Sequence, residues 1–445
     1  MRMIKLMSLV AASGVFFMAK SCMAMDLSLL DAVEKITEQS HDLKRADANV
    51  KRAQASLDAA NSNRWLSVEG SVSYMNMVNV EHPSESQTID LPPALGGLIS
   101  ETLKDQAVSI EIPDNIFMAG VSVTQPIYTF GKIGNAVKSV KSAIKMSESS
   151  REIALREVRY AAADLYWTAK MADEIVKLAK QDLQNAKTAR AQLTSAGRAN
   201  RSNLIKIESD IATKEINLSD AEFNRDTAHR MLKIMAGIDM EETLVLTDVF
   251  PATFGDLNAG KLTSTPEWDV LSEQVRMYEN MARSKRADSY PTLAATASYN
   301  YMAMSGDVGH MFDESGSQSA YWGLALQIPI FSGGLNRANA TVEAMNAAAA
   351  QQDLDKSKKI TSEKYNTAVL QYNHLRGNLK KLENARDLAA RAYKISQERF
   401  ATGQTSAVEL AEVSSGLYQL DMSLLNAKYK ILMSIESVKK LAQGE

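Results

Sequence analysis

The chain repeats one order of elements, and this duplication restricts its fold more than any other feature. Each half reads as a helix, two alternating segments, a very long helix and a further helix. The matching positions occur in the same order in both halves: Ser73-Tyr74 with Ser298-Tyr299, Pro126 with Pro329, Gly131 with Gly334, Gly197 with Gly403, and Leu204 with Leu410. Each pair alone is weak evidence, whereas the ordered set indicates an internally duplicated chain.

Four segments alternate between apolar and polar side chains, near residues 66–80, 117–128, 293–304 and 319–331. Their apolar positions are Val68, Val72 and Tyr74; Phe117, Ala119, Val121 and Val123; Leu293, Ala295, Ala297, Tyr299 and Tyr301; and Trp322, Leu324, Leu326 and Ile328. A period of two predicts β-strands with one apolar face. Such strands are typical of a membrane barrel, although a half-buried sheet in a soluble domain has the same pattern.

The number of strands limits what a membrane form of this chain can be. No stretch outside the N-terminal segment has about 18 consecutive apolar residues, so a spanning part has to consist of strands. Known barrels begin at about eight strands, and an open sheet in lipid leaves backbone groups unpaired. A membrane location therefore predicts an oligomer whose chains contribute four strands each to one barrel.

The helical segments are too long for an ordinary globular domain. Those that lead into Gly197 and Gly403 extend back for about 60 residues, or roughly 90 Å. Glycine tolerates the left-handed backbone that often ends a helix. We therefore expect each long helix to reverse at its glycine into an antiparallel partner.

The partner helices carry heptad seams. From Leu410 to Leu441 apolar residues recur at spacings of three and four, with one polar break at Ser434. A similar seam follows Leu204, where Lys214 and Arg225 interrupt it. This spacing predicts helices that pack side by side as coiled coils.

The first 24 residues have the pattern of a secretory signal peptide: two basic residues, an apolar stretch over 6–19, and small residues before a cleavage point. We expect cleavage after Ala24, which leaves a mature chain without cysteine. The alternative is a lipidated Cys22, which Lys20 fits poorly. Either reading takes the chain out of the cytoplasm.

The expected domain organisation follows from the duplication. Residues 1–24 form the signal peptide, 25–236 the first structural repeat, 237–263 an irregular equatorial linker and 264–445 the second repeat.

Composition and motifs exclude several classes of function. Lys and Arg number 50 against 53 Asp and Glu, so the chain lacks the basic excess of a nucleic-acid-binding protein. We find no phosphate-binding loop, no nucleophile elbow and no HExxH motif, and the five histidines lack metal-ligand spacing. We expect no enzymatic activity, no cofactor, no catalytic residue and no metal site.

The two strand-to-helix junctions share one pattern, Gln125-Pro-Ile-Tyr-Thr-Phe-Gly131 and Ile328-Pro-Ile-Phe-Ser-Gly-Gly334, which contain Pro126 and Pro329. In these junctions the chain resembles the outer membrane efflux protein family, the TolC-like channel-tunnels. The turns Ala196-Gly197 and Thr402-Gly403, each followed by a helix bearing leucine, complete the set. The resemblance covers nearly the whole mature chain in both repeats.

This resemblance implies a mainly α fold with membrane β-strands, assembled as a homotrimer. Four strands per chain would be pooled into a trimeric twelve-stranded β-barrel in outer membrane lipid. The long helices would continue as a periplasmic α-helical barrel whose tip meets a periplasmic adaptor (membrane fusion) protein and an inner-membrane pump. The chain would then be the passive exit duct of a tripartite efflux pump for small molecules.

The resemblance also implies positions for the functional residues. Glu409 and Glu412 match the acidic residues of the family's pore entrance, where three copies would form two carboxylate rings that favour cations. The family usually has Asp at these positions, so Glu differs in side-chain length but not in charge. Alternatively, the two glutamates only form a solvated face of the helix. Gly197 and Gly403 match the adaptor-facing turns.

Two alternatives remain open at this stage. The same duct can serve type I protein secretion, because cargo choice belongs mainly to the pump and adaptor. A different class, a non-channel secreted coiled-coil envelope protein, accounts for the signal peptide and heptads. It does not account for two matching pairs of alternating strands.

Overall fold

The structure is a computed structural model that describes residues 25–76, 115–195, 201–257, 260–305, 308–310, 312 and 316–442. It divides into two compact units. Among the described residues, unit 1 comprises those within 25–49, 148–269 and 355–442, and unit 2 comprises those within 50–147 and 270–354.

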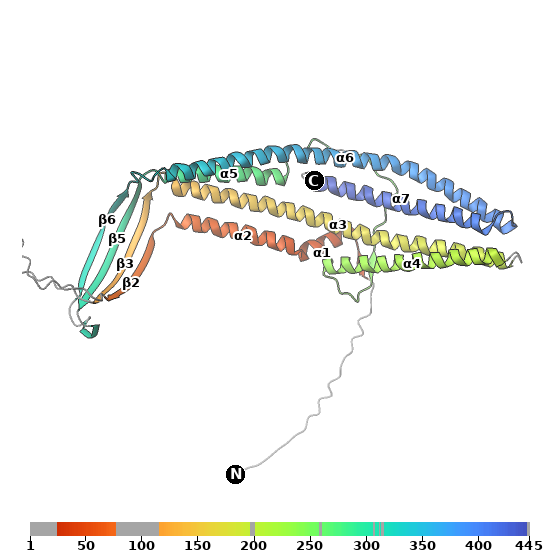
Figure 1. Ribbon diagram of the computed structural model, residues 1–445, viewed down its shortest axis with the longest axis horizontal. Coiled ribbons are helices and arrows are strands. Elements are labelled where there is room, and N and C mark those ends of the chain that lie inside the picture. Colours follow the sequence, from red (N-terminus) through yellow and green to blue (C-terminus); the bar gives the residue numbers. More distant parts are fainter. Residues whose placement is uncertain are drawn as a thin grey trace, which may run out of the picture. The chain divides into compact units, whose positions relative to one another are not determined.

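The elements occur in the duplicated order that the sequence predicts (Figure 1). They are β1 (Met25–Leu27), α1 (Leu29–Gln39), α2 (His41–Ser62), β2 (Ser67–Asn76), β3 (Asn115–Tyr128), α3 (Lys132–Ser195), α4 (Arg201–Ala236), β4 (Leu244–Leu246), α5 (Pro266–Ala287), β5 (Thr292–Ser305), the 3-10 turn η2 (Val308–His310), β6 (Ser317–Gln327), α6 (Leu335–Thr402) and α7 (Ala407–Leu441).

Unit 2 contains one antiparallel sheet with the strand order β2-β3-β5-β6. Its register places Val68 opposite Val123, Val123 opposite Ala297, and Ala297 opposite Trp322. Residues directly opposite each other share a face of the sheet. The apolar positions predicted separately for four strands therefore form one continuous apolar face.

The other face of the same sheet is mainly polar in its middle and carries Met75, Met118, Met302 and Met304 at one end. Glu69 lies opposite Ser122, and Ser122 lies opposite Ser298. A sheet with one apolar and one polar face is stable only where its two faces meet different surroundings.

Helix ends in unit 2 are joined near the base of this sheet by polar contacts. Lys132, the first residue of α3, forms a 2.8 Å ion pair with Asp288. The Ser284 hydroxyl donates to the Lys132 carbonyl at 2.9 Å, and the Asn336 amide donates to the Asp288 carbonyl at 2.9 Å. Residues that begin α3 and α6 are thereby tied to the last turn of α5 and to Asp288, which follows that helix.

The core of unit 1 is built around a pair of short parallel strands. β1 pairs with β4, and the fully buried Tyr166 of α3 donates a hydrogen bond to the Leu27 carbonyl and to Asp248. Burial and the bond to Asp248 raise the pKa of the Tyr166 phenol. The linker was predicted to be irregular, but it contains β4. This strand could not be predicted, because three residues are too few to show a sequence period.

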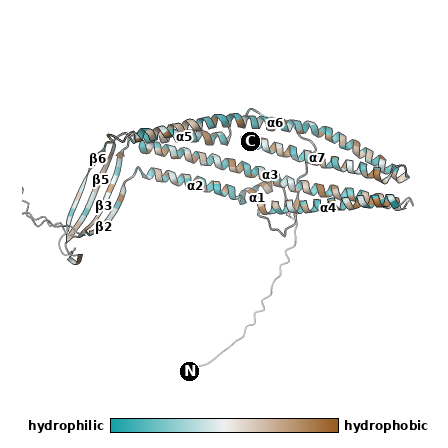
Figure 2. Ribbon diagram, in the orientation of Figure 1, coloured by the Kyte–Doolittle hydropathy of each residue, from teal (hydrophilic) through white to brown (hydrophobic). Residues whose placement is uncertain are grey.

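Long helices make up the rest of unit 1. α3 has 64 residues and α6 has 68, close to the predicted length. Their partners α4 and α7 bury seam positions such as Ile207, Leu232, Leu410 and Ile431. Hydrophilic residues recur along each long helix (Figure 2), and among the described residues no helix is long and apolar enough to cross a membrane.

Candidate functional site

The turn between α6 and α7 is closed by Gly403. Its φ is +82°, a left-handed conformation that suits glycine. The Gly403 N–H donates to the Phe400 carbonyl at 3.0 Å, and the Gln404 N–H donates to the Arg399 carbonyl at 2.8 Å. These two backbone hydrogen bonds form a Schellman motif, so Gly403 caps the C-terminus of α6. Contact of Gly403 with an adaptor stays a prediction, and Gly197 lies outside the described residues.

Glu409 and Glu412 lie in the first two turns of α7. The Ser406 hydroxyl caps this helix by accepting a 3.2 Å hydrogen bond from the Glu409 N–H. A carboxylate in the first turn also interacts favourably with the positive end of the helix dipole. Both glutamates are exposed in the single chain, and their spacing of three places them on neighbouring positions of one helix face.

Beneath this turn, an apolar cluster joins the two helical hairpins of unit 1. Phe400, Ala407 and Leu410 of the α6–α7 hairpin are buried against Ile207 of α4 and Leu193 of α3. The burial of Phe400 at 6% exposure shows that this aromatic ring is part of the packing of the tip.

A buried polar cluster that the sequence patterns did not predict lies deeper along the same helices. Lys214 of α4 forms a 2.6 Å ion pair with Oδ2 of Asp182 on α3, and the Ser414 hydroxyl of α7 donates to Oδ1 at 2.8 Å. The side chains of Lys214 and Asp182 are 5% and 10% exposed. We call Asp182, Lys214 and Ser414 the polar junction.

A signal for the ion pair was present in the sequence. In an antiparallel hairpin, residues equally distant from the turn face each other, and residues 182 and 214 are almost equally distant from Gly197. The pattern of α4 alone shows Lys214 only as an interruption of the seam, because its partner Asp182 lies on α3.

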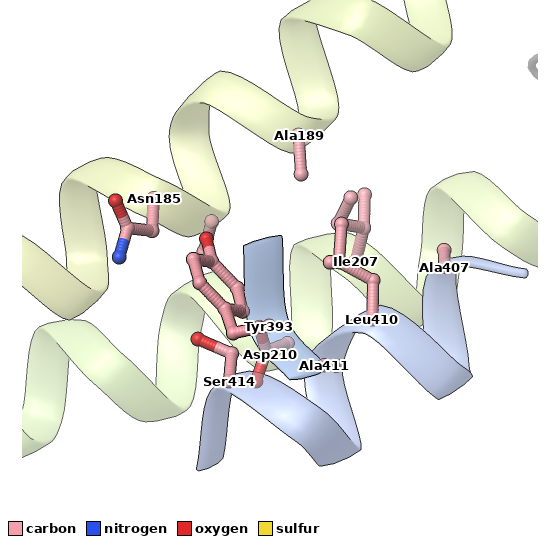
Figure 3. Close-up of a pocket in the computed structure, with 10 residues that line it drawn as sticks. Asn185, Ala189, Ile207, Asp210, Tyr393, Ala407, Leu410, Ala411 and Ser414 are labelled. Carbon is pink, nitrogen blue, oxygen red and sulfur yellow. The ribbon is translucent and has the colours of Figure 1, made fainter. Parts of the chain in front are cut away.

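A small pocket lies between the hairpins beside the polar junction (Figure 3). Asp210, Asn185, Tyr393 and Ser414 supply its polar groups, and apolar residues such as Ile207 supply the remainder. Burial raises the pKa of Asp210, and Lys214, whose ammonium lies 3.8 Å away, partly opposes this effect. Burial and the charge of Asp182 likewise raise the pKa of Tyr393.

Ion pairs also hold α3 and α4 together on the outside of their hairpin. Lys180 pairs with Glu222 at 3.1 Å, Lys187 with Glu215 at 2.9 Å, and Arg190 with Glu208 at 2.9 Å. These pairs are about half exposed, so each contributes little stability. They differ in this respect from the buried pair of Asp182 and Lys214.

The two strand-to-helix junctions have the same local geometry. Gly131 and Gly334 have φ values of +85° and +83°, and their carbonyls accept the first helical hydrogen bonds, from Asn135 at 2.8 Å and from Ala338 at 2.9 Å. The glycines thus start α3 and α6 in the same way.

The two prolines of these junctions are placed differently. Pro126 lies within β3 at a register shift, whereas Pro329 follows the end of β6. The functional importance of the four junction residues stays a prediction.

Within the described residues, no group of three or more His, Cys, Asp or Glu side chains is arranged to hold a metal ion.

Comparison with known proteins decides the family. The family model described as "Outer membrane efflux protein" matches residues 32–237 and 270–443, which together make up most of the chain. The chain belongs to the outer membrane efflux protein family. This membership confirms the predicted resemblance and the predicted fold class, a mainly α, internally duplicated chain with membrane β-strands. A comparison with curated protein sequences found no match.

Solved structures with the same fold include several outer membrane channels. The Campylobacter jejuni CmeC outer membrane channel matches with a TM-score of 0.75 at 19% identity, over 93% of this chain and 85% of that one. The outer membrane protein VceC of Vibrio cholerae matches with 0.74 at 16%, over 94% and 96%. The open state of the Neisseria gonorrhoeae MtrE channel matches with 0.74 at 15%, over 94% and 89%.

Proposed function

We propose that three copies of this chain form one outer membrane channel with a shared twelve-stranded barrel. The observation that carries the proposal is the sheet of unit 2, with one apolar face, one polar face and two outer strands, β2 and β6. Each outer strand has a strand partner on one side only within the described part of the chain. Pairing β6 of one copy with β2 of the next closes the sheet and satisfies these edges.

Exposed side chains on the outer strands fit a lipid-facing surface. Val72 is 74% exposed, Trp322 is 87% exposed and Leu324 is 70% exposed. All three belong to the apolar face, and large apolar side chains this exposed mark a surface that meets a membrane or another protein. The polar face would then line a water-filled lumen.

An exposed apolar stripe on α4 supports contact between copies in the helical part. Ile205, Ile216, Phe223 and Ile234 lie at spacings of 11, 7 and 11, which returns them to one side of a helix, and they are 58%, 61%, 71% and 59% exposed. A helix with an apolar stripe on its outer side is expected to pack against a further helix.

The proposed duct extends from the outer membrane into the periplasm and serves a tripartite efflux pump for small molecules. Transport through it is passive, and the inner-membrane pump supplies the energy. The turns at Gly197 and Gly403 face the periplasmic adaptor, and three copies of Glu409 and Glu412 form acidic rings at the pore entrance. Family membership supports this assignment, and the exposed carboxylates at the start of α7 are compatible with it.

Type I protein secretion is the alternative for the same duct. Gene neighbourhood separates the two: a proton-driven transporter with an adaptor favours efflux, and an ATP-driven exporter beside a large secreted substrate favours secretion. A non-channel coiled-coil envelope protein does not need a sheet with an apolar face and is disfavoured for that reason.

Deletion of the gene tests the proposed cargo. Cells without the chain are expected to accumulate a fluorescent efflux substrate and to regain normal efflux when the wild-type gene is restored. Unchanged accumulation together with the loss of one secreted protein from the medium would instead establish type I secretion.

A further inference from the structure

The polar junction joins three helices at a single carboxylate. Asp182 of α3 uses one oxygen for Lys214 of α4 and the other oxygen for Ser414 of α7. All three residues are less than 9% exposed. A carboxylate removed from water in this way is stable only if both oxygens are satisfied, so the three groups depend on one another.

Ser414 lies on the same stretch of α7 as the two glutamates. It follows Glu412 by two residues and Glu409 by five, within about one and a half helical turns. Any rotation of α7 that breaks the bond from Ser414 to Asp182 also changes the direction of both glutamates.

The other contacts of this stretch do not fix its rotation in the same way. Ala407 and Leu410 pack against Ile207 and Ala189 in the apolar cluster of the tip. Apolar packing is not directional, whereas a hydrogen bond weakens steeply away from its preferred angle. The bond from Ser414 to Asp182 is therefore a directional contact that resists rotation of α7 beside the two glutamates, and the 2.7 Å bond from Arg386 to Asp421 is a second one two turns further along the helix.

We propose that Asp182 and Lys214 are positioning residues for the pore entrance. They hold the Ser414 hydroxyl and thereby set the direction in which Glu409 and Glu412 point. The inference rests on the proposed function, because it takes the two glutamates as part of a channel entrance.

Lys214 has a defined part in this arrangement. Its ammonium pairs with Oδ2 of Asp182 and holds the carboxylate in place, so that Oδ1 is directed at the Ser414 hydroxyl. In some coiled coils a buried polar group fixes which packing arrangement forms, even where a buried ion pair adds little net stability. A seam made only of apolar residues would not favour one packing arrangement of α7 in this way.

The test replaces Ser414 by Ala, which breaks the link to α7 and leaves the ion pair of Asp182 and Lys214 intact. Ser423→Ala is the matched control, because the Ser423 hydroxyl donates only to the Gln419 carbonyl of its own helix, at 2.7 Å. Ser414→Thr is the conservative variant that retains a hydroxyl. Each variant is purified as the assembled channel and placed in a planar bilayer under a potassium chloride gradient.

The reversal potential reports the preference for cations over anions. Ser414→Ala is expected to lower the permeability ratio by about two-fold or more, while Ser423→Ala leaves it unchanged and Ser414→Thr restores most of it. Trimer content of Ser414→Ala should equal that of Ser423→Ala, and the lost bond to Asp182 should lower the unfolding temperature only modestly. A changed ratio in a fully assembled trimer then separates positioning from loss of assembly.

Two results would overturn the inference. One is a ratio in Ser414→Ala equal to that of Ser423→Ala, while Glu409→Gln with Glu412→Gln does lower the ratio. The other is an unchanged ratio in that double glutamate variant while the trimer still conducts. This result would show that the two glutamates do not set the cation preference of the entrance. Failure of the proposed function has a different signature, namely that the wild-type protein forms no channel.

Discussion

Loss of the Lys214 ammonium is predicted to destabilise unit 1. Lys214→Met keeps a long apolar stem but removes the ammonium that lies 2.6 Å from Asp182. The Asp182 carboxylate would then stay buried, and within the polar junction only Ser414 would remain as its hydrogen-bond partner. Removing one partner of a buried ion pair costs about 3–5 kcal/mol, and the retained bond favours the lower end, about 3 kcal/mol.

Urea titration of the detergent-solubilised protein, followed by circular dichroism at a helical wavelength, measures this cost. A loss of about 3 kcal/mol corresponds to roughly a hundredfold change in the unfolding equilibrium. Lys187→Met is the matched control, because Lys187 and Glu215 form a pair that is 48% and 53% exposed on the same two helices. That control should cost no more than about 1 kcal/mol.

A double-mutant cycle checks the physical reason. Asp182→Asn keeps an oxygen that accepts from Ser414 and removes the negative charge, so Asp182→Asn with Lys214→Met should be more stable than Lys214→Met alone. We expect a coupling energy of about 2 kcal/mol. The reasoning is refuted if Lys214→Met costs no more than Lys187→Met, or if the two single losses simply add.

Three further predictions concern the entrance, the turn and the response to alkali. Glu409→Gln with Glu412→Gln should lower the cation preference about two-fold or more in bilayer recordings. An unchanged reversal potential would contradict the assignment of these residues to acidic rings. Gly403→Val should weaken export but retain the trimer, since a β-branched residue at a positive φ costs about 1–3 kcal/mol; loss of the trimer would mean that the turn is needed for assembly. Burial and a hydrogen bond to Asp164 raise the pKa of Tyr429 to about 12, from 10.0. The unfolded chain therefore releases this proton first, so the stability due to Tyr429 is complete below pH 10 and is lost as the pH rises to about 12. Tyr429→Phe should show a smaller loss over that interval, and identical pH profiles of the two proteins would contradict this assignment.

Strand positions and faces could be predicted from the sequence because their period is unambiguous. Val68, Val123, Ala297 and Trp322 were each placed on an apolar face, and the register puts them in one row across the sheet. The shared face follows from the alternation, but the order of the strands in the sheet required the structure.

Contacts between distant segments could not be predicted in the same way. The pairing of β1 with β4 joins residues more than 200 positions apart, and three-residue strands carry no periodic signal. The polar junction was missed because a single-helix pattern cannot show that a lysine in a seam faces an aspartate on another helix. Of the candidate site, the sequence indicated the glycine turn, and the family resemblance implied the two glutamates, whose role stays a prediction.

Native mass measured on protein extracted with detergent from separated outer membranes tests the central claim most directly. A channel built from pooled strands should be recovered in the outer membrane fraction with three times the mass of one chain. A monomer or dimer recovered in the periplasmic fraction would contradict the shared barrel and leave a coiled-coil envelope protein as the better explanation.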